Sequence, residues 1–161
     1  MNRNILLTGF RGTSAELLVK RLNEYKVLLL PNDKVKDSEL LIGTMSEIMF
    51  DYVVSFGQKP NIKDKVCIET TAQNEGKLLY TDFDCDKLKS MFEQNDIPVK
   101  ISHNAGTSFC NALYFNGLEF IRENGLDTKM VFIHIPFEKN ITDINSFCEG
   151  IRRVLRKCEV V

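Results

Sequence analysis

The chain has 161 residues, 43% of them hydrophobic, and its 21 Lys and Arg residues nearly balance 22 Asp and Glu residues. This length and hydrophobic content predict a single domain, residues 1–161, with a full core. Balanced charge leaves no broad basic field, so we expect neither a nucleic-acid partner nor an anionic membrane surface. The apolar run that follows residues 1–4 is too short for a signal sequence, and no run reaches the length of about 18 apolar residues that spans a membrane, so we expect a cytoplasmic protein.

Hydrophobic periodicity predicts alternating strands and helices along the whole chain. We expect strands near residues 4–8, 26–30, 51–56, 65–72, 97–102 and 129–135. Helices are expected near residues 13–24, 38–49, 84–94, 108–124 and 142–158. This order is typical of the α/β class and predicts a three-layer α/β/α sandwich around a mostly parallel or mixed central sheet.

Cysteine usage favours a reducing compartment. The sequence has no C-x-x-C pair, and five cysteines cannot all be bridged. One of them stands out, because SHNAGTSFCN at residues 102–111 places a cysteine at the start of a helix that follows a strand. Unpaired N–H groups and the helix dipole favour a thiolate there, so we expect Cys110 to have a lowered pKa and to act as a nucleophile. A small core residue is the alternative interpretation.

A thiolate nucleophile needs a base and a group that orients the base. His134 lies near the end of a continuous apolar strand, which predicts a position at the carboxyl edge of the sheet, where open α/β folds bind ligands. Glu69 lies inside another β-prone segment, where a buried carboxylate requires a partner. A core histidine and a solvent-facing glutamate are the alternative interpretations of these two residues.

Several motifs together resemble a known family. AGTSFCN at residues 105–111 and FIHIP at 132–136 look like the cysteine and histidine motifs of the pyroglutamyl peptidases, also called pyrrolidone-carboxylate peptidases. ILLTGF at residues 5–10 is similar to the first strand of the family, and SFGQ at 55–58 to its third. Glu69 falls where the family's catalytic glutamate is expected.

The resemblance implies a phosphorylase/hydrolase-like α/β domain and a cysteine-type omega-peptidase. Such an enzyme removes N-terminal pyroglutamyl residues from small peptides through a thioester, with Cys110, His134 and Glu69 as its triad. Phe10 and Gly106 are carried over as substrate-binding residues, and backbone N–H groups from Gly106 to Cys110 are expected to stabilise the oxyanion. We expect no metal and no organic cofactor, and a homo-oligomer is an open alternative to a monomer.

The chain departs from the family pattern around the substrate pocket. After Phe10 the family continues into a Pro-Phe-Gly segment whose aromatic residues clasp the pyrrolidone ring, whereas RGTS occupies residues 11–14 here. EGKLL at residues 75–79 replaces the family's Asn-Asp-Ala-Arg stretch, and the connection before Asp51 is short. A shortened, divergent member that is weakened or inactive therefore stays open, as does a cysteine hydrolase for another acyl group.

Two other functions are alternatives. ILLTGFRGTSA at residues 5–15 is close to a dinucleotide-binding glycine turn, and Asp33 follows the second strand at about the distance of a ribose-binding acid. A metal site would have to combine side chains that show no zinc spacing, namely Cys67, His103, Cys110 and His134. A bound nucleotide or metal would favour one of these alternatives.

Overall fold

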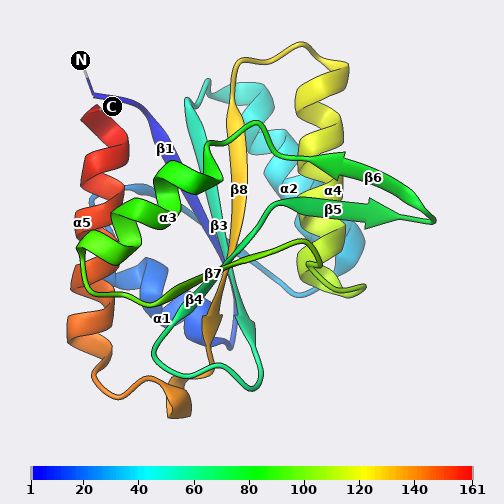
Figure 1. Cartoon of the computed structure of the whole chain (residues 1–161). Helices are drawn as coiled ribbons and strands as arrows, with labels where there is room; N and C mark the ends of the chain where they lie inside the picture. Colours follow the sequence, from blue (N-terminus) through cyan, green and yellow to red (C-terminus); the bar gives the residue numbers. More distant parts are fainter. Residues whose placement is uncertain (1, 161) are drawn as a thin grey trace.

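The computed structural model describes residues 2–160 and is built around a six-stranded sheet with the order β2-β1-β3-β8-β4-β7 (Figure 1). Strands β2, β1, β3 and β8 are parallel to one another. Strand β4 runs antiparallel to β8 and parallel to β7, so the sheet is mixed. The strands are β1 Ile5–Phe10, β2 Lys26–Leu30, β3 Tyr52–Lys59, β4 Val66–Glu69, β7 Val99–Ser102 and β8 Lys129–Pro136.

Helices cover both faces of the sheet. Helices α1 (Ser14–Arg21), α3 (Cys85–Gln94) and α5 (Ile144–Val160) pack on one face, and α2 (Lys34–Glu47) and α4 (Phe109–Glu123) pack on the other. A short 3-10 helix, η1 (Glu138–Asn140), follows β8. The expected three-layer α/β sandwich is confirmed. None of the helices within residues 2–160 is both long and apolar enough to cross a membrane.

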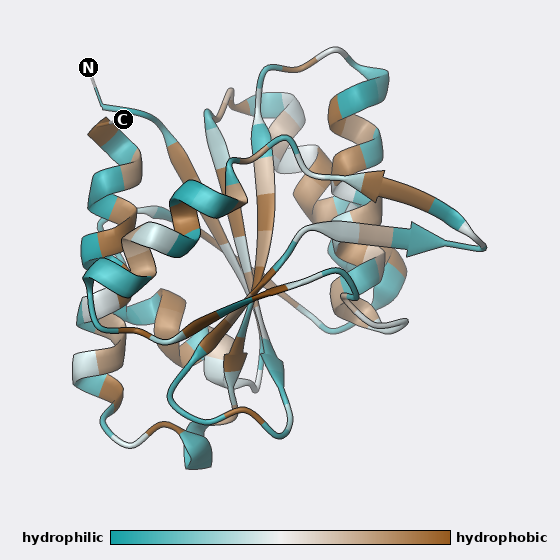
Figure 2. Ribbon diagram, in the orientation of Figure 1, coloured by the Kyte–Doolittle hydropathy of each residue, from teal (hydrophilic) through white to brown (hydrophobic). Residues whose placement is uncertain are grey.

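The central strands are apolar on both faces because helices bury both. Along β8, Val131 and Ile133 belong to the core under α1, α3 and α5, whereas Met130 and Phe132 belong to the core under α2 and α4. The hydropathy colouring shows brown along the strands and teal on the outer helix surfaces (Figure 2). This two-sided burial is the reason for the continuous hydrophobic runs in the sequence.

The expected strand at 65–72 is wrong as a single element. Strand β4 ends at Glu69, and the chain continues into a separate hairpin of β5 (Thr71–Asn74) and β6 (Lys77–Tyr80). Glu75 and Gly76 have φ angles of 48° and 84°, as a two-residue hairpin turn requires. The hairpin is attached to α4 through Asn111, whose side chain bonds the Gln73 backbone N–H and C=O at 2.9 and 2.7 Å.

Two element boundaries also differ from the expectation. Helix α2 begins at Lys34 rather than near residue 38, because Asp33 caps it by accepting hydrogen bonds from the N–H groups of Val35 and Lys36. Strand β3 continues past Gly57 to Lys59, which extends the sheet edge where the candidate site lies.

Candidate active site

His134 and Glu69 meet where β8 and β4 pair. In this antiparallel register Cys67 lies opposite His134 and Glu69 lies opposite Phe132, so Glu69 and His134 are diagonal neighbours. His134 Nδ1 is 2.7 Å from Glu69 Oε2, and the exposed fractions of the two residues are 5% and 0%. With Nδ1 donating to the carboxylate, the neutral ring carries its lone pair on Nε2. The pair therefore holds the imidazole in one orientation as a base.

Cys110 is the second residue of α4, as expected, and its thiol lies over β3. A Cβ atom added to Gly57 would lie 2.6 Å from Cys110 Sγ, and Gly57 is the β3 partner of His134. Because Gly57 has no side chain, the thiol can occupy the space above β3, next to strand β8, which carries His134. Sequence reasoning missed this role, although a glycine inside an apolar strand often marks such a close approach.

A cavity of about 440 Å³ collects these groups at the carboxyl ends of β1, β3 and β8. Four of the five predicted site residues line it, and Glu69 lies behind His134 without lining it. The structure thus brings the predicted site residues together. The cavity is lined by Phe10, Thr13, Asn32, Gln58, Lys59, Pro60, Asn104, Ala105, Gly106, Ser108, Phe109, Cys110 and His134.

The expected lowering of the Cys110 pKa is wrong. Burial raises the pKa of the thiol to about 12, and the negative charge of Glu69 acts in the same direction. The backbone N–H of Cys110 lowers this pKa, but by less than burial raises it. The free-energy cost of removing a thiolate from water is larger than the stabilisation that the helix terminus gives to the thiolate. Cys110 is therefore a thiol at rest and needs a base to become a nucleophile.

Gly106 contributes a turn to the cavity wall. Its φ angle is +89°, a conformation that favours glycine, and its N–H donates to Asn104 Oδ1 at 2.9 Å. The Gly106 amide is therefore already engaged, contrary to its expected role as an oxyanion donor. The first amides of α4 are better candidates, because helix-start N–H groups have no intrahelical acceptor and the N-cap Ser108 makes no side-chain cap bond.

Sequence reasoning also missed two other lining residues. Lys59, the last residue of β3, places Nζ 3.6 Å from Glu69 Oε2. Phe109 lines the cavity with 38% of its surface exposed, whereas Phe10 is 3% exposed and belongs to the core. Neither Lys59 nor Phe109 follows a pattern that separates it from an ordinary surface residue.

The residues of the two alternative sites have other contacts in the structure. Asp33 is the cap of α2, and His103 bonds Thr70 Oγ1 through Nδ1 at 2.6 Å without lining the cavity. Within residues 2–160, no group of three His, Cys, Asp or Glu side chains is arranged to hold a metal ion. All five cysteines are free.

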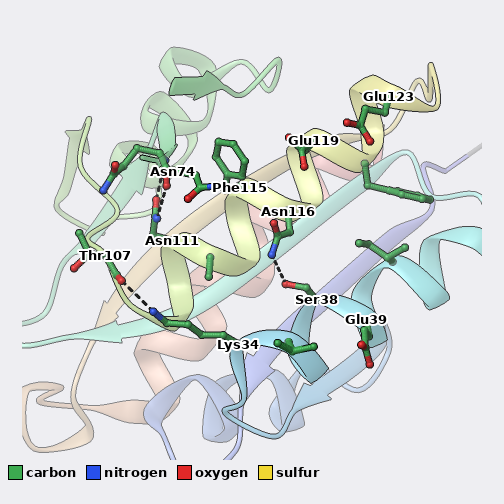
Figure 3. A pocket seen from close by; sticks show the side chains of 15 residues that line it. Lys34, Ser38, Glu39, Asn74, Thr107, Asn111, Phe115, Asn116, Glu119 and Glu123 are labelled. Atoms are coloured by element: carbon green, nitrogen blue, oxygen red, sulfur yellow. Dashed lines mark hydrogen bonds between the residues drawn. The ribbon is translucent and has the colours of Figure 1, made fainter. Parts of the chain in front are cut away.

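A larger hollow of about 560 Å³ lies between α2 and α4 (Figure 3). Lys34 Nζ donates to the Thr107 backbone oxygen at 3.4 Å, and Asn116 donates to Ser38 Oγ at 2.8 Å on its wall. Its lining residues include neither a cysteine nor a histidine. Of these two cavities, only the smaller one is lined by the candidate nucleophile and the candidate base.

A sequence model of a family described as pyroglutamyl peptidase matches residues 63–148, more than half of the 161 residues. The chain belongs to the pyroglutamyl peptidase family. The matched region contains all three residues of the predicted triad, Glu69, Cys110 and His134.

Individual members of the pyroglutamyl peptidase family are similar to this chain over different lengths. The pyrrolidone-carboxylate peptidase of Fusobacterium nucleatum is 29% identical, covering 84% of this chain and 78% of its own. That of a Thermoanaerobacter species is 36% identical, over 52% of this chain and 38% of its own. The crystal structure of pyroglutamyl peptidase I from Bacillus amyloliquefaciens superimposes with a TM-score of 0.86 at 18% identity, covering 100% of this chain and 97% of that chain. This likeness shows the shared fold.

Proposed function

We propose that this protein is a cysteine peptidase that removes N-terminal pyroglutamyl residues from peptides, with Cys110 as nucleophile, His134 as base and Glu69 as the group that orients the base. The observation that carries the proposal is the 2.7 Å bond between His134 and the buried Glu69, at the wall of a cavity that Cys110 also lines. Membership of the pyroglutamyl peptidase family supports the choice of substrate.

The acylation step begins with a protonated thiol, because burial raises the pKa of Cys110 to about 12. His134 Nε2 takes the Sγ proton as the sulfur attacks the pyroglutamyl carbonyl carbon. The Glu69 carboxylate stabilises the imidazolium that forms. His134 then gives the proton to the departing amine, the peptide C–N bond breaks, and a pyroglutamyl thioester remains on Cys110.

Deacylation uses the same groups in reverse. His134 takes a proton from water, the oxygen attacks the thioester carbonyl, and the C–S bond breaks. The sulfur recovers its proton from His134, and pyroglutamate leaves. In both steps the carbonyl oxygen becomes negative, and the first N–H groups of α4 at Phe109 and Cys110 are the donors we assign to it.

The lactam ring requires apolar walls and polar contacts at its edge. Phe10 and Phe109 supply aromatic surface on the lining, and Asn32 and Gln58 supply one amide atom each. The other amide atom of each is engaged, because Asn32 Nδ2 donates to the Arg11 backbone oxygen and Gln58 Oε1 accepts from the Ser14 N–H. We assign to Phe109 the wall that the family's Pro-Phe-Gly segment would otherwise provide. A cavity of about 440 Å³ has room for one pyroglutamyl group and the start of the leaving peptide.

Hydrolysis of a pyroglutamyl aminomethylcoumarin reporter tests the function. The purified protein should release the fluorophore, the Cys110→Ser variant should not, and an alanyl reporter should stay intact with both. If the folded wild-type protein hydrolyses no pyroglutamyl substrate, the proposed activity is wrong. Hydrolysis of another N-acyl reporter that depends on Cys110 would then identify a different acyl substrate.

A further inference from the structure

Lys59 is the one charged residue of the candidate site that the mechanism leaves without a role. Its Nζ lies 3.6 Å from Glu69 Oε2, the same oxygen that bonds His134 Nδ1 at 2.7 Å. The side chain of Lys59 is 35% exposed and that of Glu69 is 0% exposed. Lys59 therefore brings a charge from the cavity wall to a carboxylate that has no contact with solvent.

The buried carboxylate has few other partners. Glu69 Oε1 has no hydrogen-bond partner among the described residues, so Oε2 makes both polar contacts of the side chain. The cavity lining has no Asp, Glu or Arg and no second Lys. An ionised carboxylate in such a place is costly unless a cation accompanies it. Lys59, 3.6 Å from Oε2, supplies that cation.

The remaining titratable groups around the pair come from three elements. Cys110 from α4 lines the same cavity as His134, and Cys67 of β4 lies opposite His134 in the register. The hydroxyl of Tyr114 on α4 donates to the Glu69 backbone oxygen at 2.8 Å, and Asp37 on α2 adds negative charge toward Cys110. None of these groups is a cation at neutral pH.

We propose that Lys59 is a positioning residue of the triad, whose ammonium keeps the Glu69 carboxylate charged and directed at His134. The inference rests on the proposed function, because it concerns the same triad. Lys59 acts through Glu69 and need not touch the substrate. Arginine can replace it in this role, whereas a neutral side chain of similar length cannot.

The consequence for pH dependence has a definite sign. Removing the positive charge of Lys59 makes it easier to protonate the groups beside it. Activity requires His134 to be free to accept a proton. The acidic limb of the kcat/KM profile therefore moves to higher pH when Lys59 becomes neutral.

Three variants test the inference: Lys59→Met, Lys59→Arg and the control Lys63→Met. Lys63 is exposed on the connection between β3 and β4, outside the cavity lining, so this control removes one charge from the same region. We expect Lys59→Met to lower kcat about ten-fold at neutral pH. Its acidic limb should move up by about half a pH unit or more, with partial screening by solvent. Lys59→Arg should restore most of the rate, and Lys63→Met should match the wild-type protein.

The pH dependence of Cys110 alkylation by iodoacetamide provides a readout that needs no substrate. In folded Lys59→Met, as judged by its thermal unfolding, this profile should also move to higher pH. Unchanged pH profiles in Lys59→Met would overturn the inference. A rise in KM alone would also overturn it and would make Lys59 a substrate contact. A shifted alkylation profile in a protein without pyroglutamyl peptidase activity would contradict the proposed function and leave the inference standing.

Discussion

The thiol of Cys110 on α4 fills the space that a side chain at Gly57 on β3 would occupy. A Cβ on Gly57 would lie 2.6 Å from Cys110 Sγ and 2.8 Å from Cζ of Phe132, both closer than real Cβ contacts allow. The glycine in β3 therefore determines how close the start of α4 can approach the sheet, and with it how close the thiol lies to the strand of His134.

The Gly57→Ala variant should displace the thiol and lower kcat/KM about 100-fold, because small shifts of a reacting atom are costly. Gly43→Ala is the matched control, since a Cβ at that position on α2 meets nothing within 4 Å. The control should keep full activity, with a slight gain in stability from the better helix former. Steady-state kinetics and thermal unfolding of both variants check the prediction, and full activity of Gly57→Ala would refute it.

Cys110 should be the cysteine whose alkylation abolishes turnover. Its pKa of about 12 means that the free thiolate is scarce at neutral pH, so its reactivity there depends on proton transfer to His134. We expect iodoacetamide to inactivate the wild-type protein with one label at Cys110. In His134→Ala the labelling rate at neutral pH should be lower than in the wild-type protein. This rate should then increase steadily as the pH is raised. Peptide mapping that finds Cys85 or Cys158 labelled and Cys110 intact would reject the nucleophile.

The two histidines should differ sharply in importance. His134→Ala should lose nearly all turnover, about 100-fold or more, because the base is removed. His103→Ala should keep most of its activity, since His103 bonds Thr70 and does not line the cavity. Both variants are compared by kcat with the pyroglutamyl reporter. The reverse order of activities would exchange the two roles.

Phe109 should contribute to substrate binding with little effect on folding. Loss of one apolar wall is worth about 1 to 3 kcal/mol, so Phe109→Ala should raise KM roughly ten-fold or more with a smaller change in kcat. Phe10→Ala is a less clean test, because Phe10 is 3% exposed in the core and its loss should also destabilise the fold by about 3 kcal/mol or more. An unchanged KM for Phe109→Ala would remove Phe109 from the pocket.

The alternation of strands and helices, the helix start near Cys110 and the buried strand of His134 are all predictable from the amino-acid sequence. These features depend on periodicity, turn residues and the flanking chain, which are local. Residue chemistry also identified Glu69 as the carboxylate that needs a partner. The first residue of α2 is predictable in the same way, because Asp33 is a typical capping residue. The weaker apolar pattern after Asp33 instead favours a helix that begins later than the observed one.

How these parts meet depends on long-range packing, which the sequence does not reveal. That β4 runs antiparallel to β8 makes Glu69 a diagonal neighbour of His134, and strand direction depends on pairing between distant segments. The same applies to Gly57 beneath the thiol and to Lys59 beside the carboxylate. The pKa of Cys110 reversed its expected direction for a related reason. A helix terminus is visible in the sequence, whereas the burial that outweighs it is produced by the packing of α4 onto the sheet.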